Sequence, residues 1–93
     1  MNNELVIRNF LRGLDGKTPM RDVTNGYYIY KGRTLYTSGE YLINYATRIA
    51  KRDGNVVFLN VNKYSVTTSK IQNKIRSLSK EYGLQLVEVE GEM

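Results

Sequence analysis

The chain has 93 residues, and its 14 Lys and Arg against nine Asp and Glu give a net charge of +5. This length predicts one domain, residues 1–93, that buries roughly 60 to 65% of the surface of its unfolded chain. Because the sequence contains no Cys and no His, disulfides are excluded, as are zinc or haem sites with thiolate or imidazole ligands. We expect no cofactor.

The hydropathy of the chain gives no sign of a membrane protein. No apolar run approaches the ~18 residues of a membrane-spanning helix, and the first residues do not resemble a signal peptide. We therefore expect a soluble protein of the cytoplasm that makes no contact with a membrane.

The first predicted element is a short N-terminal helix. Apolar residues from Val6 to Leu14 share one helical face, and Gly13 and Gly16 limit its length. Residues 14–26, which include the only Pro of the chain, predict a long loop.

A four-stranded antiparallel meander is predicted next, because apolar and polar residues alternate and glycines separate the runs. Lys31-Gly32 and Asp53-Gly54 have the composition of tight turns, and Ser38-Gly39 separates the second strand from the third. The four strands are expected at residues 27–30, 33–37, 41–50 and 55–62.

An amphipathic helix and a final strand complete the prediction. Ile71, Ile75, Leu78 and Tyr82 form one stripe that packs on the sheet. Thr67, Thr68 or Ser69 is expected to cap the helix, with Gln72 at capping-box spacing from Ser69, and Gly83 is expected to end it. Residues 84–90 follow as a strand and residues 91–93 as a tail, which gives an α+β fold of order α-β-β-β-β-α-β.

The charge is unevenly distributed. Residues 1–80 hold all 14 bases and five acids, whereas residues 81–93 hold four Glu and no base. A basic body attracts nucleic acid, or the acidic and phosphate-rich surfaces of proteins that handle it. The alternative is that the lysines only solvate a small domain.

Tyrosine is unusually frequent, with eight residues in the chain and six of them between Tyr27 and Tyr45. Aromatic rings that lie near basic residues can stack on unpaired nucleotides or anchor protein interfaces. The alternative is structural, because Tyr is a good strand former. Two binding surfaces follow as hypotheses, a hairpin tip and the outer side of the second helix, with the residues Tyr28, Tyr30, Lys31, Arg33, Lys70, Lys74, Arg76 and Lys80.

Catalytic chemistry finds little support in the sequence. No His is present, the acids are scattered, and the Ser/Thr cluster at residues 65–69 lacks a partner base. We expect a protein that is not an enzyme.

Three segments carry a resemblance to a family of small proteins of phages, plasmids and integrative elements. They are the strand motif at residues 45–50, the Val-Phe-Leu-Asn strand at residues 57–60 and the helix entry Tyr-Ser-Val-Thr-Thr-Ser-Lys at residues 64–70. Gln72 matches the family pattern, whereas Ile71 stands where the family commonly has His.

The resemblance implies a mobile genetic element in a bacterial host. Small proteins of that origin without catalytic residues are often stoichiometric binders that disable host defence. We therefore expect a viral inhibitor of a host defence nucleoprotein, such as an RNA-guided nuclease of a CRISPR system. The alternative is an accessory or regulatory protein that binds DNA or RNA directly.

Overall fold

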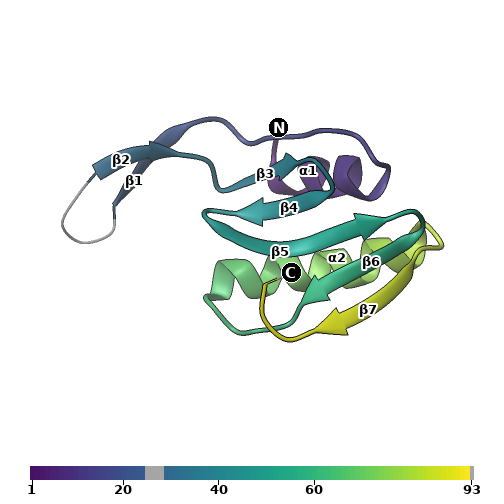
Figure 1. Ribbon diagram of the computed structural model, residues 1–93. Coiled ribbons are helices and arrows are strands. Elements are labelled where there is room, and N and C mark those ends of the chain that lie inside the picture. Colours follow the sequence, from purple (N-terminus) through teal and green to yellow (C-terminus); the bar gives the residue numbers. More distant parts are fainter. Residues whose placement is uncertain (25–28, 93) are drawn as a thin grey trace.

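The computed structural model describes the backbone of residues 1–24 and 29–92 and the side chains of residues 1–22 and 32–92. The described chain has two helices and seven strands, arranged as a five-stranded sheet, a layer of two helices on one of its faces, and a separate two-stranded ribbon (Figure 1). The elements are α1 (Asn3–Leu11), β1 (Arg21–Thr24), β2 (Ile29–Gly32), β3 (Leu35–Ser38), β4 (Tyr41–Asn44), β5 (Thr47–Asp53), β6 (Val56–Asn60), α2 (Val66–Glu81) and β7 (Gln85–Val89).

The predicted α+β class is confirmed. The large sheet has the order β3-β4-β5-β6-β7, in which the first four strands form an antiparallel meander. The last strand, β7, pairs with β6 in parallel, because α2 carries the chain back to the other end of the sheet. Both helices lie on the same face, α1 against β3 and β4 and α2 against β6 and β7.

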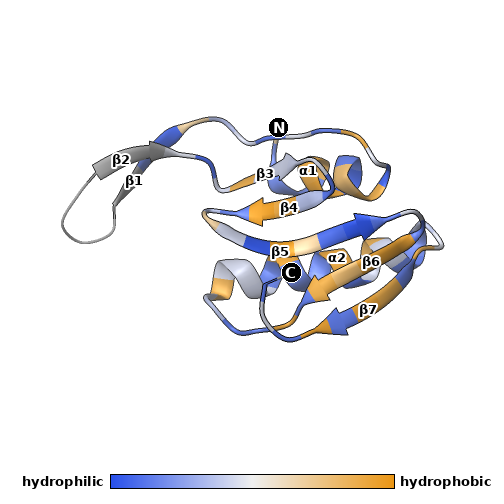
Figure 2. Cartoon of the chain, in the orientation of Figure 1, coloured by the Kyte–Doolittle hydropathy of each residue, from blue (hydrophilic) through white to orange (hydrophobic). Residues whose placement is uncertain are grey.

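The core lies between the helices and this face of the sheet. Ile71, Ile75 and Leu78 of the predicted stripe are buried, and Tyr82 packs against the core from the end of the helix. The strands contribute every second residue, and among these Leu42, Ala50, Val57 and Leu59 are fully buried. In Figure 2 the hydrophobic β4 and β6 flank β5, whose two ends are hydrophilic.

The ends of α2 show which local signals were identified correctly. The N-cap is Ser65, whose side chain accepts a hydrogen bond from the backbone N–H of Thr68, so a cap at residues 67–69 was wrong by two to four residues. At the other end Gly83, with φ of +68°, ends the helix as predicted. The Leu84 N–H donates to the Ser79 carbonyl in a Schellman motif.

The first part of the predicted meander was wrong in two places. Residues 41–50 are two strands, since the chain turns at Tyr45 with φ of +56° and continues as β5. The residue with positive φ is Tyr45 and not a Gly or an Asn. The alternation of residue types along residues 41–50 therefore continues through the turn without a break. The predicted hairpin of residues 27–30 and 33–37 is wrong in its described part, because β2 pairs with β1 and β3 pairs with β4. Residues 27 and 28 lie outside the described residues.

Residues 14–26 were predicted as a loop but contain β1 and a short edge segment. The Thr18 N–H donates to the Leu35 carbonyl and the Thr37 N–H to the Gly16 carbonyl, with Lys17 opposite Tyr36. This segment covers the outer edge of β3, which would otherwise expose unpaired backbone groups. Within the described residues, no helix is both long and apolar enough to cross a membrane.

Candidate binding face of the sheet

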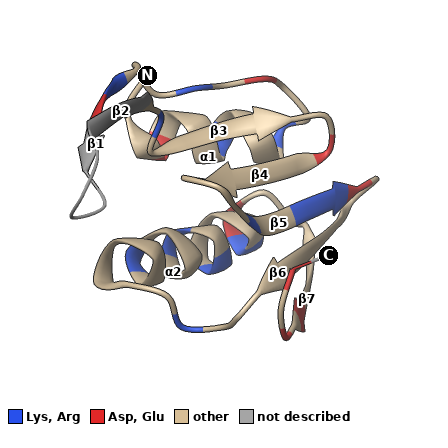
Figure 3. Ribbon diagram, turned by 60° about the vertical axis from the view of Figure 1, so that its left-hand side comes forward, with Lys and Arg blue, Asp and Glu red and all other residues tan. Residues whose placement is uncertain are grey.

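The face of the sheet turned away from α1 and α2 is covered by neither helix (Figures 1 and 3). Because side chains alternate along a strand, the residues between the buried ones point to this second face. Strand register aligns them in two cross-strand rows. The first row is Lys17, Tyr36, Ile43 and Arg48, and the second is Ser38, Tyr41, Lys51, Phe58 and Val87. We call these residues the open face.

A β-bulge between β4 and β5 sets the first row. Leu42 stands opposite Ala50 and Ile43 opposite Arg48, so Ile49 is the extra residue of β5 and is buried. If side chains alternated regularly back from the buried Ala50, Ile49 would point to the open face and Arg48 to the helix side of the sheet. The bulge therefore places the side chain of Arg48 on the open face.

Cations and rings contact one another on the open face. The guanidinium carbon of Arg48 lies 4.7 Å from the ring centroid of Tyr41, and the ammonium of Lys51 lies 5.6 Å from it. Each contact contributes on the order of 0.5 to 1 kcal/mol at an exposed position. Tyr41 thus holds two positive charges close together at the middle of the sheet. The Arg48 backbone N–H donates to Glu92 Oε1 at 2.7 Å, which places part of the acidic tail at the end of this face.

The cations predicted on the second helix do not form a joint basic surface with the open face. Two of them are ion-paired, Lys74 with Glu4 at 3.0 Å and Arg76 with Glu88 at 2.8 Å. The Lys74 hydrogen bond is the main reason that the pKa of Glu4 is lowered. These pairs link α2 to α1 and β7, so they serve the fold. Lys70 and Lys80 are exposed on α2.

The predicted hairpin tip is only partly described. Tyr28 lies outside the described residues, and the side chains of Tyr30 and Lys31, whose backbone belongs to β2, lie outside them as well. Arg33 is described, and it lines a cavity of about 600 Å³ beside β3.

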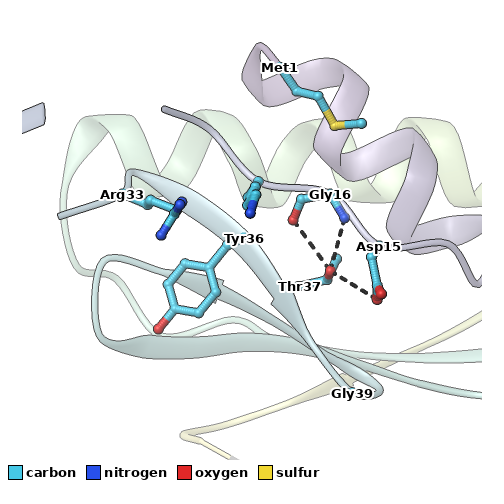
Figure 4. Close-up of a pocket in the computed structure, with 8 residues that line it drawn as sticks. Met1, Asp15, Gly16, Arg33, Tyr36, Thr37 and Gly39 are labelled. Carbon is cyan, nitrogen blue, oxygen red and sulfur yellow. Dashed lines mark hydrogen bonds between the residues drawn. The ribbon is translucent and has the colours of Figure 1, made fainter. Parts of the chain in front are cut away.

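Figure 4 shows this cavity, which is lined by Met1, Asp15, Gly16, Lys17, Arg33, Tyr36, Thr37 and Gly39. The Thr37 hydroxyl is held by the Gly16 backbone N–H at 3.0 Å and lies 3.4 Å from Asp15 Oδ1. Asp15 lies beyond Thr37, on the side away from Arg33 and Tyr36. Since Lys17 and Tyr36 belong to the first row, the cavity continues the open face at its β3 margin.

The motif residues behind the family resemblance have structural roles. Asn60 is fully buried, and its Nδ2 donates to the Arg48 carbonyl at 3.2 Å and to the Tyr64 hydroxyl at 2.8 Å. Its own carbonyl accepts from Gln72 Nε2 at 2.7 Å. The Thr68 hydroxyl donates to Asn44 Oδ1 at 2.6 Å. The hydroxyl cluster at residues 65–69 is thus used for capping and for joining α2 to the sheet.

A second tyrosine is surrounded by arginines at the junction of the helices. Arg8 Nη1 and Arg12 Nη2 donate to the Tyr82 hydroxyl at 3.0 and 3.2 Å, and Arg8 also lies 3.7 Å from Glu81. The two hydrogen bonds lower the pKa of Tyr82, because they stabilise the phenolate. This cluster fastens α1 to the end of α2.

The residues of the open face are not among the predicted binding residues, although the predicted surfaces also combine rings with cations. Tyr41, Arg48 and Lys51 all fall within or beside one predicted strand, where their spacing does not bring them together. The turn at Tyr45 does so by folding that segment back on itself. No signal for this turn is present in the residue types.

The described residues contain no group of three or more acids that could hold a metal ion. Comparison with protein-family models, with curated proteins and with solved structures finds no match to this chain.

Proposed function

We propose that the protein is a non-catalytic binding protein whose open face takes single-stranded nucleic acid. The observation that carries this proposal is the alternation of rings and cations in the two cross-strand rows, with Tyr36, Tyr41 and Phe58 beside Lys17, Arg48 and Lys51. Proteins that bind single strands combine these two elements, because the rings stack on bases and the cations follow the phosphates.

The dimensions of the open face suit a short stretch of single strand. Neighbouring strands of a sheet lie about 4.8 Å apart, so the distance from the Lys17 segment to β7 is about 24 Å. That width corresponds to a site of roughly 4 nucleotides, at the lower end of the range for sheet surfaces of this kind. A sheet face stacks exposed bases, which a duplex keeps inside its helix.

A second candidate is the inhibitor of a host defence nucleoprotein. The observation in its favour is that Ile43, Phe58 and Val87 place apolar side chains next to the cations of the open face. Aromatic and basic residues around an apolar centre are typical of protein interfaces. Such an inhibitor acts one to one with its target, since it does not turn over a substrate.

The test compares two charge-matched double variants by fluorescence anisotropy with a labelled oligonucleotide of about 10 nucleotides. Lys17→Gln with Lys51→Gln removes two charges from the open face, and Lys70→Gln with Lys80→Gln removes two from α2. The first pair is expected to reduce the salt slope of log affinity by about 1.4, at roughly 0.7 per phosphate contact, and the second to leave it unchanged.

The aromatic contribution is tested separately with Tyr36→Ala. Loss of one stacked base costs about 1 to 3 kcal/mol, which weakens binding roughly 5- to 150-fold. Equal effects of the two double variants, or no binding of any single strand at low salt, would contradict the proposal. In that case titration of a purified host nuclease would test the inhibitor, with complete inhibition expected at one protein per target.

A further inference from the structure

The cavity beside β3 has the features of a site for a small anion. Two cationic residues, Lys17 and Arg33, line it together with Tyr36. Figure 4 shows Arg33 and the ring of Tyr36. Its volume of about 600 Å³ lies within the range of small-molecule sites in proteins. We infer that it binds a phosphate monoester, and that on the open face this is the terminal phosphate of the bound strand. The second half of this inference rests on the proposed function.

The guanidinium of Arg33 provides the first argument. Its Nε is buried and has no hydrogen-bond partner among the described residues. A buried donor on a charged group is costly when it lacks an acceptor. The Arg33 side chain lines the cavity, and guanidinium groups bind phosphate in a bidentate manner.

The balance of charge favours a monoester over an internal phosphodiester. A phosphate monoester carries about −1.5 to −2 at neutral pH, whereas a diester of the backbone carries a single charge. Two cations facing one cavity match the monoester. The carboxylate of Asp15 also lines the cavity, but it lies beyond Thr37, away from Arg33 (Figure 4).

The position of Tyr36 links the cavity to the open face. Its ring belongs to the first row and also lines the cavity, and Lys17 does the same. A single-stranded nucleic acid that stacks on the first row therefore reaches the cavity with its terminal nucleotide, beyond the edge strand β3. Among the described residues, the edge segment of residues 16–18 is what pairs with β3 on its outer side, and we take it as the end of the row.

The experiment measures the affinity of one oligonucleotide sequence in three forms, with a 5′-phosphate, with a 3′-phosphate and with neither. We expect one of the two phosphates to tighten binding about tenfold, as one hydrogen bond to a charged group does. Arg33→Gln should remove this gain and leave the affinity for the unphosphorylated form nearly unchanged. Lys17→Gln should reduce the gain as well, but it also lowers the affinity for the unphosphorylated form, because Lys17 belongs to the open face. Lys70→Gln on α2 is the matched control.

A fourth ligand, a free mononucleotide, separates the two parts of the inference. Binding of the oligonucleotide without any effect of a terminal phosphate, or a phosphate effect that persists in Arg33→Gln, would overturn the inference and leave the proposed function intact. If no oligonucleotide binds, the proposed function fails. The cavity is then tested by NMR titration with the mononucleotide, where shifts at Arg33 and Tyr36 support a phosphate site and their absence refutes it.

Discussion

Replacement of Asn60 by alanine is expected to be among the most damaging single changes in this protein. The amide makes three hydrogen bonds, to the Arg48 carbonyl at 3.2 Å, to the Tyr64 hydroxyl at 2.8 Å and from the Asn62 backbone N–H at 3.0 Å. It is completely buried. It therefore holds β5, β6 and the segment that leads into α2 in one arrangement.

The magnitude follows from the bonds that are lost. Each hydrogen bond contributes a net ~1 kcal/mol, and the deletion leaves the Arg48 carbonyl and the Asn62 N–H without their partner. We expect the free energy of unfolding to fall by about 3 kcal/mol. A domain of this size has a total of roughly 5 to 14 kcal/mol, so a large fraction of the stability is lost.

Urea titration followed by circular dichroism measures this change, with the slope of the transition as a check that the unfolded state is unaltered. Asn55→Ala is the matched control, because Asn55 is exposed in the turn before β6 and should change the free energy by less than about 0.5 kcal/mol. Tyr64→Phe removes only the hydroxyl acceptor and should cost about 1 kcal/mol. A loss below about 1 kcal/mol for Asn60→Ala would refute the idea that this side chain joins the three segments.

Three further predictions test other parts of the structure. Leu78→Ala, at a residue only 4% exposed, should lower the free energy of unfolding by about 2 to 5 kcal/mol in the same titration, and a loss under about half a kcal/mol would show that the stripe is not core. Tyr45→Asn should raise it by about 0.5 kcal/mol, because Asn tolerates the positive φ better than Tyr does; a loss of stability would argue against strain at the turn. The pKa of Tyr82 should lie below its usual value of 10.0, because Arg8 and Arg12 stabilise the phenolate. The stability that the ionised Tyr82 contributes is therefore fully present above pH 10 and is lost as the pH falls through the lowered pKa. An ultraviolet titration of tyrosinate that is the same in Tyr82→Phe would contradict this assignment, and Arg12→Gln should move the ionisation back towards the usual value.

The parts of the fold that were predicted correctly depend on local signals. The apolar stripe of α2, the glycine after it and the Asp53-Gly54 turn are each determined by a few neighbouring residues. The turn at Tyr45 was missed because a tyrosine at positive φ is held there by the pairing of β4 and β5, which acts over distance. The pairing of β1 with β2 was missed because Lys31-Gly32 has the composition of a turn and lies instead within and at the end of a strand.

The open face differs from the two binding surfaces that the sequence predicts. Rings and cations were expected to work together, and the open face brings Tyr41, Arg48 and Lys51 together. The β-bulge at Ile49 determines which cations lie on the same face of the sheet. No residue type in the sequence predicts that bulge. The ion pairs of Lys74 and Arg76 depend on how α2 lies against α1 and β7, which is a property of the tertiary structure.

The contacts between α1 and α2 determine when the protein can finish folding on the ribosome. Glu4 and Arg8 of α1 form ion pairs with Lys74 and Glu81, and Arg8 also donates a hydrogen bond to Tyr82. These contacts of α1 can form only after residues that are synthesised about seventy positions later have left the ribosome. Until α2 has emerged, the apolar face of α1 has only the strands β3 and β4 to pack on. A stalled or truncated product that ends before α2 therefore lacks one of the partners that bury Val6, Ile7 and Phe10, and this incomplete core is a surface for chaperones.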